Sequence, residues 1–143
     1  MWIFTVYGFY SISAKQGSPR VFIRARDKQH LLNLKARVKD WIGKCPVITT
    51  PNRDYGYRLS VPKDVWVEIA ANLAEEQTWD NFKSECTRRF GTRDPYIAAL
   101  HEVWYRMSQL QPYGWWNLWE RNKRQKLTAK EQLEFDRLFA HVE

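Results

Sequence analysis

The chain has 143 residues, of which 44% are hydrophobic and 15% aromatic, and its formal net charge is +7. This length fits one folded domain, and the composition excludes an intrinsically disordered chain. Residues 1–44 contain nine Lys or Arg and two Asp and carry the whole net charge, whereas residues 45–143 contain fourteen residues of each sign. A positive charge confined to one part of a chain favours an anionic partner: a phosphate backbone, an anionic membrane or an acidic protein surface.

Cysteine usage and hydropathy predict a cytoplasmic protein. Cys45 and Cys86 are too few and too far apart for a disulfide framework or a zinc cluster, so we expect reduced thiols, no metal and no cofactor. The apolar residues 1–14 follow no basic leader, and they alternate with polar residues instead of forming a solid block. No apolar run approaches transmembrane length, so we expect no membrane association.

The first predicted elements are two strands joined as a hairpin. Residues 2–13 are rich in β-branched and aromatic types, with Gly8 as a bulge or a point of close approach. Residues 15–19 turn the chain, and residues 20–26 then alternate strictly, which is typical of a half-buried strand. One face of this strand carries Val21, Ile23 and Ala25, and the other carries Arg20, Phe22, Arg24 and Arg26.

A helix over residues 28–42 follows, with Asp27 as its N-cap, and residues 46–50 and 54–61 form a second strand pair. In the last of these strands one face carries Tyr55, Tyr57, Leu59 and Val61, and the other carries Arg58 and Ser60. A further helix begins near Pro62. The order ββαββα predicts the α+β class, with a four-stranded antiparallel sheet, ferredoxin-like layering and both helices on one face.

The remainder is predicted to form about three helices. The first covers residues 80–90, the second begins at Asp94-Pro95, and the last opens with the capping box Thr128-x-x-Glu131. We expect an α+β domain over residues 1–111 and a helical C-terminal extension over residues 112–143.

Several short motifs resemble a family of small bacterial proteins of uncharacterised function. The shared pieces are Met1-Trp2-Ile3-Phe4-Thr5, Gly8-Phe9-Tyr10-Ser11, Arg24-Ala25-Arg26, Asp54-Tyr55-x-Tyr57-Arg58, Asp80-Asn81-Phe82-Lys83 and His101-x-Val103-Trp104. The resemblance covers roughly residues 1–110 and is fairly specific in order and spacing. It implies that residues 112–143 are an extension, and it implies no function.

The arginine face of strand 20–26 is the strongest candidate site. Beside the first strand and Arg58 it would form a basic surface with aromatic rings, on which guanidinium groups hold phosphates and rings stack on unpaired bases. The predicted nucleic-acid-binding residues are Tyr7, Lys15, Arg20, Phe22, Arg24, Arg26 and Arg58. The alternative is a solvated strand face with ordinary surface charge, or a face covered by the C-terminal helices.

A tryptophan-rich segment in the extension is the second candidate site. Its predicted partner-binding residues are Trp115, Trp116, Trp119, Arg121 and Arg124. Tryptophan and arginine are enriched in binding hot spots, although the spacing of residues 115, 118 and 119 is also that of the packed stripe of a docking helix.

Signals for catalysis are weak. Cys86 and His101 would form a nucleophilic pair if their helices pack together, but Cys86 shares an apolar stripe with Phe82 and Phe90, where an inert thiol is expected. The sequence has neither a Gly-rich phosphate loop nor metal-ligand spacing. We therefore predict no catalytic residue.

The leading hypothesis is a non-enzymatic module that binds RNA, single-stranded DNA or a nucleoprotein complex through the arginine face. The alternative is a protein-interaction component that uses the tryptophan-rich segment, such as an inhibitor or accessory subunit of a bacterial defence, anti-defence or other nucleoprotein assembly. A small hydrolase or nuclease is the third hypothesis. Salt dependence separates the first two, because phosphate binding weakens steeply with salt and a tryptophan-anchored contact does not.

Overall fold

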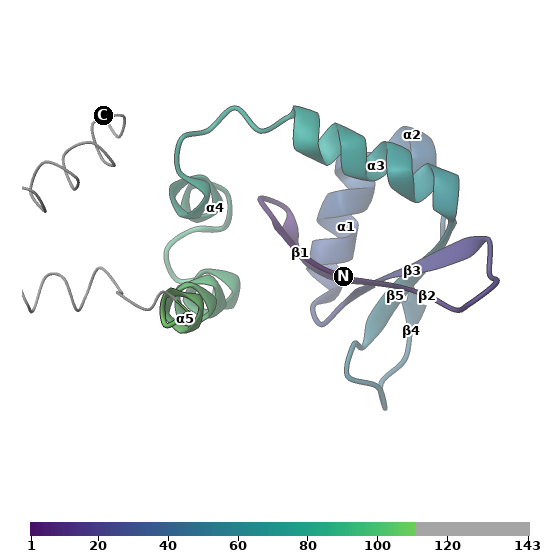
Figure 1. Ribbon diagram of the computed structural model, residues 1–143, viewed down its shortest axis with the longest axis horizontal. Coiled ribbons are helices and arrows are strands. Elements are labelled where there is room, and N and C mark those ends of the chain that lie inside the picture. Colours follow the sequence, from purple (N-terminus) through teal and green to yellow (C-terminus); the bar gives the residue numbers. More distant parts are fainter. Residues whose placement is uncertain (111–143) are drawn as a thin grey trace, which may run out of the picture. The chain divides into compact units, whose positions relative to one another are not determined.

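The computed structural model describes residues 1–110 of the chain (Figure 1). Residues 1–100 form one compact unit, and the boundary with a second unit falls after Leu100. Because the structure describes residues 1–110, the predicted extension over residues 112–143 lies outside the described residues. So do its predicted partner-binding residues Trp115, Trp116, Trp119, Arg121 and Arg124.

A five-stranded antiparallel sheet forms the centre of the first unit, which confirms the α+β class. Its strands are β1 (Trp2–Thr5), β2 (Gly8–Ala14), β3 (Arg20–Ala25), β4 (Ile48–Thr49) and β5 (Tyr57–Pro62). They lie in the order β1-β2-β3-β5-β4. The prediction of four strands in the order ββαββα is wrong, because the N-terminal segment forms two strands instead of one.

The extra strand arises from a tight turn at Val6 and Tyr7. Thr5 Oγ1 accepts a hydrogen bond from the Tyr7 N–H at 3.0 Å and donates to the Gly8 carbonyl at 3.1 Å, which closes the β1–β2 hairpin. Gly8 has a φ of 141°, and a Cβ there would lie 2.4 Å from the His30 ring. Gly8 therefore marks the start of a new strand and a close approach to α1, and not a bulge within one strand.

Five helices occur in the described part of the chain: α1 (Lys28–Arg37), α2 (Lys39–Ile42), α3 (Lys63–Glu75), α4 (Phe82–Phe90) and α5 (Pro95–Ser108). The predicted helix over residues 28–42 is interrupted at Val38, whose φ of −118° and ψ of 42° are not helical. Asp27 caps α1 as predicted, because its side chain accepts a hydrogen bond from the Gln29 N–H. Two predicted C-terminal helices correspond to α4 and α5, and the third lies outside the described residues.

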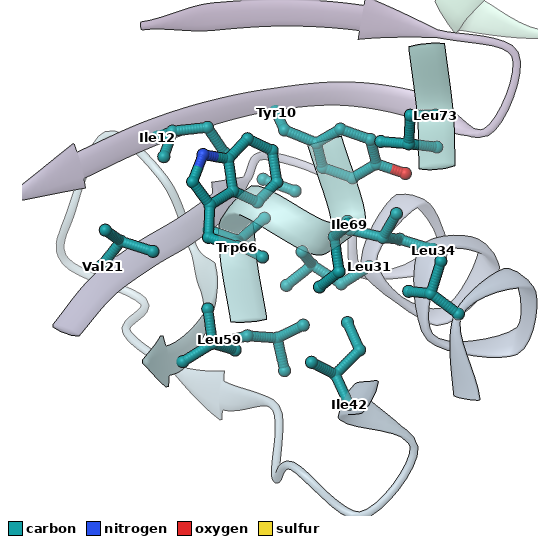
Figure 2. Close-up of a cluster of buried hydrophobic side chains, with 14 residues drawn as sticks. Tyr10, Ile12, Val21, Leu31, Leu34, Ile42, Leu59, Trp66, Ile69 and Leu73 are labelled. Carbon is teal, nitrogen blue, oxygen red and sulfur yellow. The ribbon is translucent and has the colours of Figure 1, made fainter. Parts of the chain in front are cut away.

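The main core lies between one face of the sheet and the helices α1, α2 and α3 (Figures 1 and 2). The residues predicted to be buried on this face are at most 4% exposed: Val21, Ile23, Ala25, Leu59 and Val61. Leu31, Leu34, Ile42, Trp66 and Ile69 cover them from the helices. Because both layers contribute large apolar side chains, the hydrophobic effect fixes which face of the sheet points to the helices.

A second cluster joins the β1–β2 hairpin to α4 and the first turns of α5. Its buried members are Val6, Cys86, Tyr96, Ile97 and Leu100. The Tyr96 hydroxyl and the Cys86 thiol both donate to the Thr5 carbonyl, at 2.9 and 3.8 Å.

Among the described helices, none has the length and apolar composition of a membrane span.

His30 is buried where these two clusters meet. Its Nδ1 accepts a hydrogen bond of 3.4 Å from the Phe9 N–H, and its ring packs against the rings of Phe90 and Tyr96. Burial lowers the pKa of His30 from its ordinary value of 6.5, and the nearby Asp27 and Asp94 oppose this shift only in part. Burial therefore favours the neutral form of the imidazole.

Candidate nucleic-acid interface

The sheet face that points away from α1 and α3, here called the open face, carries most of the predicted site. The register places Trp2, Ser11, Arg24, Arg58 and Ile48 in one row across the five strands. A second row consists of Ser13, Phe22 and Ser60. Phe22 is half-buried, and its register partners Ser13 and Ser60 are both small.

The arginines of the open face are held in place by neutral acceptors. Arg20 donates to the side chain and the carbonyl of Ser60, at 2.9 and 2.6 Å. Arg24 donates to Ser11 Oγ at 2.7 Å, and Arg58 donates to Thr50 Oγ1 at 2.9 Å. These bonds orient the guanidinium groups without neutralising their charge.

Elsewhere in residues 1–110 three arginines form ion pairs with carboxylates, whereas Arg93 and Arg106 form none within this range. Arg37 pairs with Glu76, and Arg88 and Arg89 both pair with Glu85. The two guanidinium groups lower the pKa of Glu85 to about 2. None of the open-face arginines forms such a pair with a described carboxylate, so this face keeps its positive charge.

Tyr55 lies on the open face, which corrects the sequence prediction that it shares a face with Tyr57. The guanidinium carbons of Arg24 and Arg26 are 4.8 and 5.4 Å from the centre of its ring. The alternation predicted for residues 54–61 fails because β5 begins only at Tyr57. Before it, the bond from the Thr50 N–H to the Gly56 carbonyl closes a loop.

Aromatic rings continue from Tyr55 toward the N-terminal edge of the sheet. The Phe9 ring is 6.4 Å from Tyr55, 4.7 Å from Phe4 in a stacked arrangement and 5.7 Å from Trp2 in an edge-to-face arrangement. Trp2 is 67% exposed and ends this aromatic track, which consists of Tyr55, Phe9, Phe4 and Trp2. Tyr55 is buried, and Phe4 and Phe9 are partly buried against the second cluster, so Trp2 is the most exposed ring of this track.

A pocket of about 490 Å³ opens where the β4–β5 loop meets the open face. It is lined by Lys15, Arg24, Asn52, Arg53, Asp54, Tyr55 and Arg58, and is here called the basic pocket. Three predicted site residues, Lys15, Arg24 and Arg58, come together in it. Four cations and one carboxylate give the lining a formal charge of +3.

The other predicted residues have different positions. Arg20 and Phe22 lie on the open face outside the pocket lining, and Arg26 packs on Tyr55. Tyr7 does not belong to the open face: it lies in the hairpin turn, and its hydroxyl donates to Glu76 at 3.1 Å. Tyr7 is misplaced because the prediction treated residues 2–13 as one alternating strand.

Sequence reasoning missed Trp2, Arg53 and Tyr55 as site residues. The turn around Pro51-Asn52-Arg53-Asp54 is evident in the sequence, but no local sequence pattern indicates that its side chains border the open face. The exposure of Trp2 depends on β1 being an edge strand, which follows only from the hairpin.

The arrangement offers little for catalysis. Cys86 is fully buried, and burial raises the pKa of its thiol to about 11, so the nucleophilic thiolate does not form near neutral pH. Within residues 1–110, no group of three or more His, Cys, Asp or Glu side chains could hold a metal ion.

Comparison of the chain with protein-family models, curated proteins and solved structures gives no match. The resemblance to the small bacterial family therefore stays a prediction, and the functional argument depends on the geometry of the open face.

Proposed function

We propose that this protein binds single-stranded nucleic acid, RNA or DNA, through its open face, as a binding module that catalyses no reaction. One observation carries the proposal. Six cationic side chains lie on or beside the open face, and none of them pairs with a carboxylate in the described part of the chain. They are Lys15, Arg20, Arg24, Arg26, Arg53 and Arg58. A surface that keeps so much unpaired charge has a strong affinity for phosphate backbones.

The aromatic rings favour a single strand over a duplex. In a duplex the faces of the bases are covered by neighbouring base pairs, so aromatic side chains on a protein surface cannot stack on them. In a single strand each base can stack on a ring such as Trp2 or Phe22, next to the cations that hold the phosphates. The alternation of rings and cations across the open face matches this mode of binding.

Two charge-matched variants test the proposal. In the first, Arg20, Arg24 and Arg26 are replaced by Glu, which changes the net charge from +7 to +1 because each replacement changes the charge by two. In the control, Lys28, Lys39 and Arg93, which are exposed outside the open face, are replaced by Glu to give the same net charge. Circular dichroism verifies that both variants fold.

The measurement is fluorescence anisotropy with labelled single-stranded RNA, single-stranded DNA and duplex DNA. We expect the unmodified protein to bind single strands more tightly than the duplex, the open-face variant to lose binding, and the control variant to keep most of it. Equal loss in both variants would mean that only the total charge matters, and the open face would not be the site. If the unmodified protein binds none of the three probes, the proposal is wrong and the hypothesis of a protein partner replaces it.

A further inference from the structure

The basic pocket contains an unfavourable pair of like charges. Arg24 of β3 and Arg58 of β5 are direct partners in the antiparallel ladder. Like charges in such positions destabilise a sheet. Ser11 on β2 and Thr50 beyond β4 hold the two guanidinium groups from opposite sides, but neither acceptor carries a charge. An anion between the two arginines would remove the repulsion.

Arg58 also has an unused donor. Its Nε atom is buried and has no hydrogen-bond partner among the described residues. A buried N–H group without an acceptor has a cost, and native structures usually supply a partner. Because Arg58 lines the basic pocket, a small rotation of its side chain on ligand binding would bring this N–H group to an oxygen atom of the ligand.

Two further cations border the same space. Lys15 follows β2, and Arg53 lies in the β4–β5 loop. Asp54 also lines the pocket but forms no ion pair with any described cation. The volume of about 490 Å³ lies within the range of small-molecule sites. A phosphodiester group carries a single negative charge. It would neutralise only part of the positive charge of the four cations around the pocket.

We infer that the basic pocket binds a phosphomonoester group, namely the terminal phosphate of a nucleic-acid strand. This inference rests on the proposed function. A terminal phosphate carries a charge of about −1.5 to −2 near neutral pH and presents three acceptor oxygens, which suits a cluster of guanidinium groups. Beyond the buried Tyr55, the partly exposed Phe9 and the exposed Trp2 provide rings for the nucleotides that follow the terminus.

The experiment compares strands that differ only in their ends. Single strands of about ten nucleotides, a length within the site sizes of known single-strand binders, carry a 5′-phosphate, a 3′-phosphate or hydroxyl groups at both ends. Binding to the full chain is measured by fluorescence anisotropy. The label is at the end opposite the phosphate, and each phosphorylated strand is compared with an unphosphorylated strand labelled at the same end. A nucleoside monophosphate, which offers the same group free in solution, is titrated by calorimetry.

We expect one of the two phosphorylated strands to bind about tenfold more tightly than the strand with hydroxyl ends, since charge-assisted hydrogen bonds are added. Arg58→Gln should abolish this preference. Because Arg58 is half-buried, Arg53→Gln in the exposed loop is the second variant, and Arg93→Gln in the exposed α4–α5 loop is the matched control that keeps the preference.

The outcomes separate this inference from the proposed function. If all strands bind equally, the protein binds nucleic acid but the pocket is not specific for a terminal phosphate, and the inference is wrong. If the monophosphate binds and no strand does, the strand is the wrong source of the phosphate and the proposed function fails. If neither binds, both are wrong.

Discussion

The salt dependence of binding gives a quantitative test of the open face. Each phosphate that a protein cation contacts on a single strand contributes about −0.7 to the slope of log affinity against log salt concentration. If all six unpaired cations of the open face contact phosphates, the slope is about −4. Between about 50 mM and about 200 mM salt, the affinity of the unmodified protein should then fall about 300-fold.

Replacing Arg20, Arg24 and Arg26 by Gln removes three of these contacts without adding negative charge. The slope should become about −2, and the same increase in salt should lower the affinity only about 20-fold. Fluorescence anisotropy at four or more salt concentrations measures both slopes. An unchanged slope in a folded variant would refute the reasoning, because the three arginines would then contact no phosphate.

Four further predictions concern single residues. Phe22→Ala should weaken binding to a single strand by about 1–3 kcal/mol if a base stacks on this ring; an unchanged dissociation constant would exclude stacking there. Stability should fall as the pH drops below about 6.5, by at most about 1.4 kcal/mol per pH unit, because burial lowers the pKa of His30 in the folded protein and the unfolded chain therefore binds more protons. Denaturant titrations between about pH 7.5 and pH 5 measure this, and His30→Gln should remove the dependence. Gly8→Ala should destabilise the fold by about 2–5 kcal/mol, since the positive φ is unfavourable for alanine and its Cβ would overlap His30; a wild-type melting temperature would contradict the hairpin geometry. In the native protein a thiol reagent should modify Cys45 and leave the buried Cys86 unmodified until the chain unfolds; equal rates for the two thiols would be incompatible with the second cluster.

Strict alternation made β3 predictable from the sequence. Residues 20–26 give apolar and basic side chains opposite faces, and burial of the apolar face against the helices leaves only one register. The same reasoning places Arg58 beside Arg24. The helix boundaries at Gly91 and Asp94-Pro95 were also predictable, because these residues end and begin helices through their own backbone and side-chain chemistry.

Two features that lack a recognisable local sequence signal were not predictable. The hairpin turn at Val6 and Tyr7 contains none of the usual turn residues at its centre, and the Thr5 hydroxyl stabilises it. Tyr55 leaves the alternating pattern because Gly56 precedes the strand, and the arginines of β3 then attract its ring. Local hydrogen bonds in the first place and a tertiary contact in the second override a pattern that favoured one longer strand.

The two edges of the sheet leave little backbone for a further strand. β4 has only two residues, and β1 has four, the last of which already uses its carbonyl to accept hydrogen bonds from Tyr96 and Cys86. Long unpaired edges invite intermolecular β-pairing and aggregation, and short or covered edges resist both. An extended peptide that joins a sheet needs a row of free N–H and C=O groups, which these edges provide only in part. Within the described residues, side chains on the flat of the sheet are therefore a better means of recognition than its backbone, and neither of these two edges should support self-association through β-pairing.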